Sequence, residues 1–193
     1  MSATIERPGK VWTEAELQAL PNNGYNHEVV DGELIMSPKN NFYHGDICSR
    51  LLAALVNFNR THKLGAVLDS STGFWMSNRN CRAPDVSFVS KARLRSLGFT
   101  RTTQEFFPGG PDLAVEVLAP SNTRAEMDAR LRDFFTSGTQ LAWVVHPDEQ
   151  FVEVCHSPTE RQIIGSGAFL EGEHLLPGFQ FPVTDLFSAG DWD

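Results

Sequence analysis

The chain has 193 residues, 41% of them hydrophobic, and a formal net charge of −8. We predict a single domain over residues 1–193, because this length and composition suffice for one buried core. The acidic balance excludes an indiscriminate nucleic-acid coat, no run approaches the roughly 20 apolar residues of a membrane span, and the N-terminal residues lack a signal-peptide core, so we expect a cytoplasmic protein.

The three cysteines, Cys48, Cys81 and Cys155, lie far apart in the sequence and are odd in number. This spacing matches neither a zinc pattern nor a disulfide framework. We therefore interpret them as reduced, buried thiols.

The first half of the chain is predicted to contain two helices and several short strands. Thr13 and Glu16 match a capping box, and Asp31-Gly32 is a two-residue hairpin turn. Apolar residues at helical spacing mark a third, longer element after the hairpin. In chain order we expect a helix at 13–20, a hairpin at 27–36, a helix at about 41–62 and strands at 66–69, 74–76 and 85–89.

Basic residues concentrate between Arg79 and Arg101, where Asp85 is the only acid. On an acidic protein, such a stripe favours phosphate contacts made by one face, although the same excess also fits a solvated loop. Residues 90–110 lack a regular pattern and are predicted to form a long loop. The basic residues of the stripe are Arg79, Arg82, Lys91, Arg93, Arg95 and Arg101.

The run from Leu113 to Leu118 is nearly continuous in apolar residues, which is typical of a strand buried on both faces. Glu116 interrupts the run, and it shares a face with Ala114 and Leu118 because side chains alternate along a strand. An unpaired carboxylate in that position would cost several kcal/mol. We therefore expect a cation, a hydrogen-bond donor or a metal opposite Glu116.

A helix is predicted after this strand, since Thr123 and Glu126 form a second capping box and Gly138 supplies a stop. Arg130 borders the apolar face of this helix, from which its long side chain can reach back to the strand that carries Glu116. Glu116 and Arg130 are therefore a candidate pair. The apolar face consists of Met127, Leu131, Phe134 and Phe135.

The C-terminal part of the chain continues with strands. We expect strands at 140–145 and 151–155, and shorter pieces at 161–164 and 168–170 are expected to extend the same sheet. Helices interleaved with strands predict the α/β or α+β class, with a mixed central sheet flanked by helices and a strand-helix-strand unit at its centre.

Asp85, Glu116 and Arg130 form a candidate functional constellation. Two carboxylates on adjacent strands can hold a hard divalent cation such as Mg²⁺, which polarises a phosphoryl oxygen and lowers the pKa of a bound water. A neighbouring cation steadies the developing charge, so the three residues favour phosphodiester hydrolysis. The alternatives are a turn or cap acid at Asp85, and a buried structural ion pair between Glu116 and Arg130 that holds no metal.

Several motifs in order resemble one nuclease family. They are His27-Glu-Val-Val-Asp-Gly-Glu33, Pro84-Asp85, Asp112-Leu-Ala-Val-Glu-Val-Leu-Ala-Pro-Ser121, a helix, Gly138, and Leu141-Ala-Trp-Val-Val-His-Pro147. Over roughly Thr13 to Cys155 the chain resembles the Uma-two family of bacterial restriction endonucleases, within the PD-(D/E)XK nuclease superfamily. The resemblance implies a restriction-endonuclease-like fold with a nuclease core at about 25–155.

The resemblance also implies an activity and a set of site residues. It implies an endonuclease that acts on DNA, requires Mg²⁺ or Mn²⁺, and often works as a homodimer. Asp85 and Glu116 would be metal ligands together with the main-chain carbonyl of Val117. Glu28 would be an accessory acid.

The position of the usual lysine leaves alternatives open. Two residues after Glu116, where many such nucleases carry lysine, this chain has Leu118, and the aligned position on the following helix is Arg130. Arginine keeps the charge but cannot act as a general base, so Arg130 would hold the scissile phosphate. The same difference fits a nuclease-like module that has lost catalysis and acts in binding or regulation. A third hypothesis is a metal-independent hydrolase that uses two carboxylates as acid and base.

Glu28 and His44 also have purely structural interpretations. Glu28 is flanked by polar hairpin residues and fits a solvated strand position. His44 falls where the resembling chains often carry a histidine, but it lies near a predicted helix start and fits a cap-region residue. We leave His44 outside the predicted site.

Overall fold

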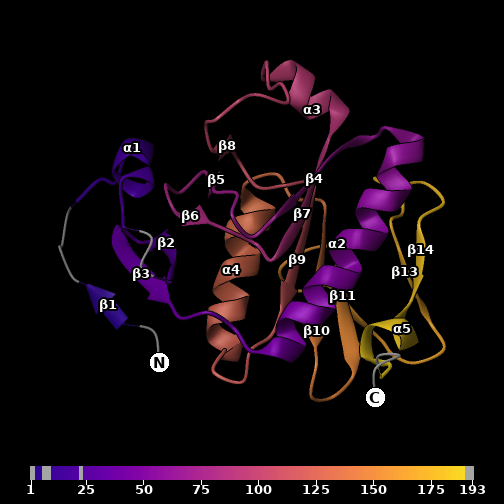
Figure 1. Cartoon of the computed structure of the whole chain (residues 1–193). Coiled ribbons are helices and arrows are strands. Elements are labelled where there is room, and N and C mark those ends of the chain that lie inside the picture. Colours follow the sequence, from indigo (N-terminus) through magenta and orange to yellow (C-terminus); the bar gives the residue numbers. More distant parts are fainter. Residues whose placement is uncertain (1–2, 6–9, 22–23, 190–193) are drawn as a thin grey trace.

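The computed structural model describes residues 3–5, 10–21 and 24–189, which form five helices and fourteen strands (Figure 1). The helices are α1 (Glu14–Gln18), α2 (Phe42–His62), α3 (Lys91–Ser96), α4 (Arg124–Thr136) and α5 (Val183–Phe187). The strands are β1 (Ala3–Ile5), β2 (Asn26–Val30), β3 (Glu33–Ser37), β4 (Gly65–Asp69), β5 (Phe74–Trp75), β6 (Cys81–Arg82), β7 (Val86–Ser90), β8 (Phe107–Pro108), β9 (Leu113–Val117), β10 (Leu141–His146), β11 (Phe151–Cys155), β12 (Arg161–Ile164), β13 (Phe169–Glu171) and β14 (Gln180–Pro182).

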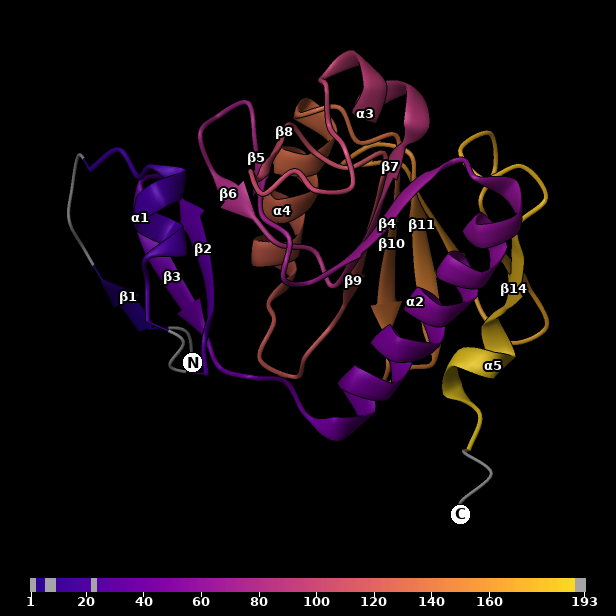
Figure 2. The ribbon, with the colours of Figure 1, turned by 45° about the horizontal axis from the view of Figure 1, so that its top comes forward.

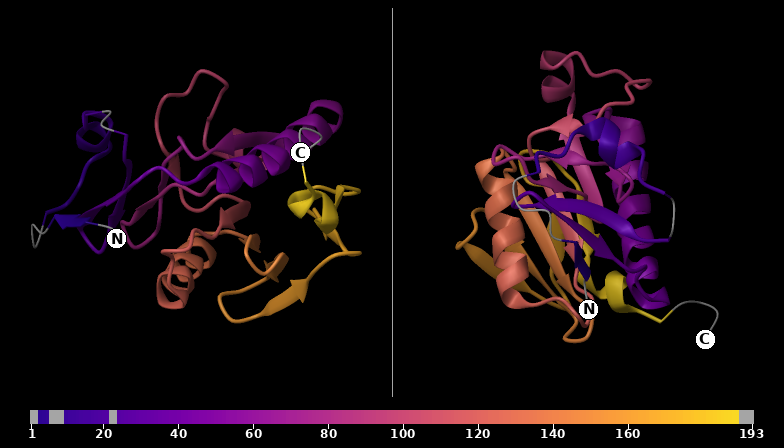
Figure 3. Two further views of the ribbon diagram at one scale, coloured as in Figure 1. Left: turned by 60° about the horizontal axis from the view of Figure 1, so that its bottom comes forward. Right: turned by 90° about the vertical axis from the view of Figure 1, so that its left-hand side faces the viewer.

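A mixed six-stranded sheet with the order β12-β11-β10-β9-β7-β4 forms the centre of the molecule. Strands β9 and β10 are parallel and joined by α4, whereas the other neighbours in this sheet pair antiparallel. Helix α2 covers one face of the sheet and α4 covers the other (Figure 3). The predicted mixed fold class and the central strand-helix-strand unit are therefore confirmed.

Strand β9 is buried on both faces, as its apolar run predicts. Leu113, Val115 and Val117 pack with the apolar face of α2, whereas Ala114 packs with the apolar face of α4. The predicted alternation is thus observed, and it places Glu116 on the side of the sheet that α4 covers.

The two predicted capping boxes are both formed. The side chains of Thr13 and Thr123 cap α1 and α4 by accepting from the backbone N–H of the glutamate three residues later, and that glutamate's carboxylate accepts from the threonine N–H. Each box provides acceptors for two backbone N–H groups that would otherwise lack a partner at the helix start. Local sequence therefore fixes where α1 and α4 begin. The second box sets which residues of α4 face the sheet.

A second sheet, with the order β1-β3-β2-β6-β5-β8, carries the predicted hairpin. Strands β2 and β3 pair antiparallel around Asp31 and Gly32, which both have positive φ, as the two-residue turn requires. In Figures 1 and 2 the elements α1, β2 and β3 lie at one end of the molecule, and α5 lies at the other. Strand β6 pairs with β2 and is buried.

Two predictions for the second half of the chain are wrong. The predicted loop at 90–110 contains α3 and β8. The Ser90 side chain caps α3 by accepting a hydrogen bond from the Arg93 N–H, and β8 pairs with β5. Strand β13 does not extend the central sheet but pairs with β14. A turn separates it from β12, with Gly167 at φ +89° and the Ala168 N–H donating to the Gly165 carbonyl.

The three cysteines are free thiols, as predicted; Cys81 and Cys155 are buried, and Cys48 is only half-buried. Of the helices in the described ranges, none combines the length and apolar character needed to cross a bilayer.

Candidate active site

Asp85 and Glu116 are brought together by the pairing of two neighbouring strands. In the antiparallel register of β7 and β9, Val86 lies opposite Val115. Asp85 precedes Val86 and Glu116 follows Val115, so the two acids lie opposite one another one step beyond this pair. The Asp85 Oδ2 accepts a hydrogen bond of 2.9 Å from the backbone N–H of Val117. This bond holds one carboxylate at the end of the strand that carries the other.

Arg130 of α4 joins Glu116 to Glu28 of the hairpin. Its Nη1 donates to Glu116 Oε1 at 3.0 Å and to Glu28 Oε1 at 2.8 Å, and its Nη2 donates to Glu28 Oε2 at 2.7 Å. The predicted contact between Glu116 and Arg130 is therefore observed. The two parallel bonds to Glu28 are the stronger, two-pronged arrangement of a guanidinium with a carboxylate. Glu28 is 9% exposed, so its interpretation as a solvated strand residue is wrong.

Arg82 and Asp133 extend this cluster and were not predicted from the sequence. Arg82 is 6% exposed and contacts Asp133 through Nε at 2.8 Å and Nη2 at 2.6 Å, while its Nη1 lies 3.4 Å from Glu28 Oε2. The side chains of Asn78 and Asn80 also donate to Asp133. The available signal was the spacing of Arg130 and Asp133, three residues apart on one helix, which places both on the same side.

The basic stripe between Arg79 and Arg101 does not form one continuous surface. Arg82 and Arg93 turn inward, where Arg93 donates to the carbonyl of Gly110 and lies 3.4 Å from Asp112. The pairing with Asp133 buries the Arg82 guanidinium away from any phosphate-binding face, whereas Arg93 is half-buried. The exposed members of the stripe are Arg79, Lys91, Arg95 and Arg101.

The cluster carries an excess of negative charge. Its carboxylates are Glu28, Asp85, Glu116 and Asp133, and its guanidiniums belong to Arg82 and Arg130. When every one of these groups is ionised, the four carboxylates and two guanidiniums give the cluster a formal charge of −2. A divalent cation carries the charge that would balance this sum.

This excess is reflected in the titration of the buried pair. Burial, with a smaller contribution from the charges of Asp85 and Glu28, raises the pKa of Glu116 to about 8 against the opposing effect of Arg130. Burial alone would lower the pKa of Arg130, but Glu116 and Glu28 outweigh it and raise that pKa. The single positive charge of Arg130 cannot balance the negative charges of both Glu116 and Glu28.

His44 lies beside this cluster, although we did not predict it as part of the site. Its backbone N–H donates to the side chain of Asn41, the N-cap of α2, as a cap-region residue would. Its ring also points to the carboxylates, with Nε2 3.3 Å from Asp85 Oδ2. The Nδ1 atom lies 3.4 Å from the sulfur of Cys48. His44 therefore has both a capping position and a contact with a predicted metal ligand.

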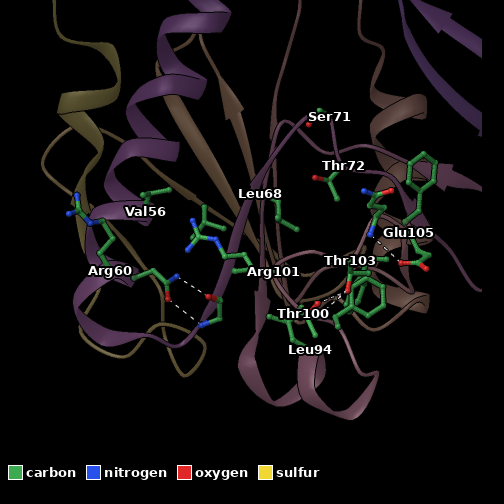
Figure 4. A pocket seen from close by; sticks show the side chains of 18 residues that line it. Val56, Arg60, Leu68, Ser71, Thr72, Leu94, Thr100, Arg101, Thr103 and Glu105 are labelled. Atoms are coloured by element: carbon green, nitrogen blue, oxygen red, sulfur yellow. Dashed lines mark hydrogen bonds between the residues drawn. The ribbon is translucent and has the colours of Figure 1, made fainter. Parts of the chain in front are cut away.

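A separate cavity of about 730 Å³ lies along β4, the edge strand of the central sheet. Figure 4 shows Arg60 of α2 and Arg101 of the loop after α3 on its rim. Its lining includes none of the four predicted site residues Glu28, Asp85, Glu116 and Arg130. The cavity and the carboxylate cluster are therefore different places on the molecule.

We expect Asp133→Asn to lower the free energy of unfolding by roughly 1–3 kcal/mol, because it leaves the buried Arg82 without its nearer charged partner and with only the longer contact to Glu28. Urea denaturation measures this loss. The matched control is Glu173→Gln, which removes the charge from a partly exposed pair with His156 and should cost less than about 1 kcal/mol. Equal losses in the two variants would contradict a structural role for Asp133.

A family model described as "Uma2: Putative restriction endonuclease" matches residues 14–184, a span that includes every residue of the cluster. The chain belongs to the Uma2 family. The family resemblance inferred from the sequence motifs is thus confirmed. The description of the Uma2 family is that of a nuclease, a hydrolase that acts on nucleic acid.

One solved structure similar to this Uma2 chain is described as a putative nuclease belonging to DUF820 from Anabaena variabilis ATCC 29413. The TM-score is 0.78 at 20% sequence identity, and the match covers 91% of this chain and 97% of that chain. At this identity the likeness establishes the shared fold. A search of curated proteins finds no significant match.

Proposed function

We propose that this Uma2 protein is a metal-dependent endonuclease that hydrolyses phosphodiester bonds of DNA. The observation that supports the proposal most is the formal −2 excess of the cluster, in which the pairing of β7 and β9 brings two carboxylates, Asp85 and Glu116, opposite one another. Hard cations such as Mg²⁺ and Mn²⁺ prefer oxygen ligands of this kind. The donor set therefore fits such an ion.

In this proposal Asp85, Glu116 and the main-chain carbonyl of Val117 hold Mg²⁺ or Mn²⁺. The bound metal would supply an activated water and would polarise the phosphoryl oxygen. Asp85 is already fixed by the Val117 N–H, so it would bind without a further loss of side-chain freedom. Glu116 is held by Arg130 and would exchange part of that contact for the ion.

Arg130 would contact the scissile phosphate and stabilise its developing negative charge. Its planar fork is suited to phosphate oxygens, and a guanidinium remains protonated, so it acts as a charge and not as a base. Glu28 accepts two hydrogen bonds from the Arg130 guanidinium and would position it. Glu28 is therefore proposed as the accessory acid of the site, acting through Arg130.

A second candidate function is a nuclease-like module that binds or regulates without cutting. It is supported by the same contacts of Arg130, because Nη1 and Nη2 are both engaged by glutamates before any phosphate arrives. An arginine held in this way can act as a structural tie between Glu28 and Glu116. The two functions differ in whether the chain nicks DNA.

The test is isothermal titration of Mn²⁺ into the purified chain, combined with nicking of supercoiled plasmid with and without EDTA. We expect Mn²⁺ binding and nicking that EDTA abolishes. Binding without nicking would favour the non-cutting module, and neither binding nor nicking would leave Glu116 and Arg130 as a structural pair. Nicking that survives EDTA would instead favour metal-independent hydrolysis.

A further inference from the structure

His44 and Cys48 lie one turn apart on α2, and both approach Asp85. The ring Nδ1 of His44 is 3.4 Å from the Cys48 sulfur, and its Nε2 is 3.3 Å from Asp85 Oδ2. One atom from each of the three side chains lies within 4.8 Å of the other two. The spacing of four residues on a helix directs both α2 side chains to the same side.

These three side chains differ chemically from the carboxylate pair. They offer one nitrogen, one sulfur and one oxygen, and a thiolate and an imidazole select Zn²⁺ and related ions over Mg²⁺. Metal–ligand bonds of about 2.0–2.3 Å place neighbouring ligand atoms of a tetrahedral site roughly 3.4–3.6 Å apart. The Cys48 sulfur lies 3.4 Å from Nδ1 of the His44 ring and the Asp85 oxygen lies 3.3 Å from Nε2, so one of these distances is of this size at whichever nitrogen binds the ion. The remaining ligand atom lies within 4.8 Å of the other two, and side-chain rotation would bring it to the same ring nitrogen.

We propose that His44, Cys48 and Asp85 form a binding site for a divalent transition-metal ion of the Zn²⁺ class, with the fourth position left to water. His44 would bind through one ring nitrogen. The Cys48 thiol would bind as a thiolate, and its proton would leave to solvent.

The surroundings of the three residues suit a resident cation. His44 is 6% exposed, whereas Asp85 and Cys48 are half-buried, so an ion can enter and still be shielded on one side. Asn40 contacts His44 Nε2 at 3.0 Å and can fix the orientation of the ring. The negative excess of the neighbouring carboxylates also attracts a positive ion to this position.

The zinc-class site is distinct from the proposed Mg²⁺ site but shares Asp85 with it. Its existence does not depend on the proposed nuclease activity, because it requires only that the three side chains bind an ion. Where both sites exist, one carboxylate serves two ions, so we expect Zn²⁺ and Mn²⁺ to compete for Asp85.

Co²⁺ is a suitable probe, because its bond to a thiolate gives a charge-transfer absorption band. The full-length chain, reduced and stripped of metal, would be titrated with Co²⁺ and then with Zn²⁺, and compared with Cys48→Ser, Glu116→Gln and the thiol control Cys155→Ala. We expect the band in the starting protein, in Glu116→Gln and in Cys155→Ala. In Cys48→Ser we expect no band and at least about a 10- to 100-fold rise in the Kd for Zn²⁺.

The outcomes separate this proposal from the nuclease proposal. Loss of the band in Cys48→Ser, with the band kept in Glu116→Gln, supports the zinc-class site even if Mn²⁺ binding and nicking are absent. A band that survives Cys48→Ser, or no band in the starting protein, overturns the site even if Mn²⁺-dependent nicking is present. The absence of a band in the starting protein is measured without any variant. The proposal can therefore still be refuted if the Cys48→Ser protein fails to fold.

Discussion

Replacement of Glu116 by glutamine is expected to reduce DNA nicking by about 10³-fold, equivalent to roughly 4 kcal/mol of transition-state stabilisation. Glutamine keeps the shape of the side chain and removes the negative charge that would hold the ion. Mn²⁺ binding should weaken in parallel, because Asp85 would be the remaining carboxylate ligand. Initial nicking rates at saturating Mn²⁺, and titration calorimetry on the same preparations, measure the two effects.

A stability measurement distinguishes this loss from misfolding. The pKa of Glu116 is raised from 4.5 to about 8 in the folded, metal-free protein, chiefly by burial. A carboxyl group with a raised folded pKa contributes stability that is full below pH 4.5 and is lost as the pH rises through 8. The glutamine variant lacks this loss, so its free energy of unfolding should fall less between pH 5 and about 8. A variant that unfolds more readily than the starting protein throughout this range would attribute the lost activity to the fold.

Replacement of Arg130 by methionine is expected to lower nicking by about 10²–10³-fold, because the developing charge on the phosphate loses its guanidinium partner. Mn²⁺ affinity should be kept or increased, because Glu28 and Glu116 lose a competing cation. The nicking rate should therefore fall without a loss of Mn²⁺ affinity. Joint loss of metal binding and nicking would instead indicate that Arg130 only holds the carboxylates in place.

The lysine variant of the same position tests the alternative function. Arg130→Lys keeps one positive charge and loses the planar fork that engages Glu28 twice. If the arginine contacts the phosphate, this variant should nick faster than Arg130→Met but slower than the starting protein. Faster nicking than the starting protein would identify arginine as an impaired form of the usual lysine.

The contact between Glu116 and Arg130 could be predicted because each partner is fixed by local sequence. The apolar run sets the strand and shows the charge inside it, and the capping box sets the phase of α4. The pair then follows from two periodicities, 2.0 and 3.6 residues. The neighbouring position of Asp85 followed from its place at the start of the adjacent strand.

The remaining partners depended on contacts that no local pattern contains. Glu28 meets Arg130 across 102 residues, and Arg82 meets Asp133 across 51. Arg82 also lies in a two-residue strand, too short for alternation to show which way its side chain points. For His44 a local signal did exist, since Cys48 follows it by four residues on a helix. This spacing indicates a metal site only together with Asp85, which the fold brings next to His44 and Cys48.

The bond between Glu28 and Arg130 has a consequence for how this protein would respond to a ligand. Glu28 belongs to the hairpin sheet and Arg130 to the helix on the central sheet, so this contact fastens two layers together as well as lining the candidate site. A phosphate that draws the guanidinium toward itself must take it partly from Glu28. Binding of the phosphate would therefore weaken the contact between the two layers, and a tighter contact between the layers would weaken phosphate binding by the same free energy.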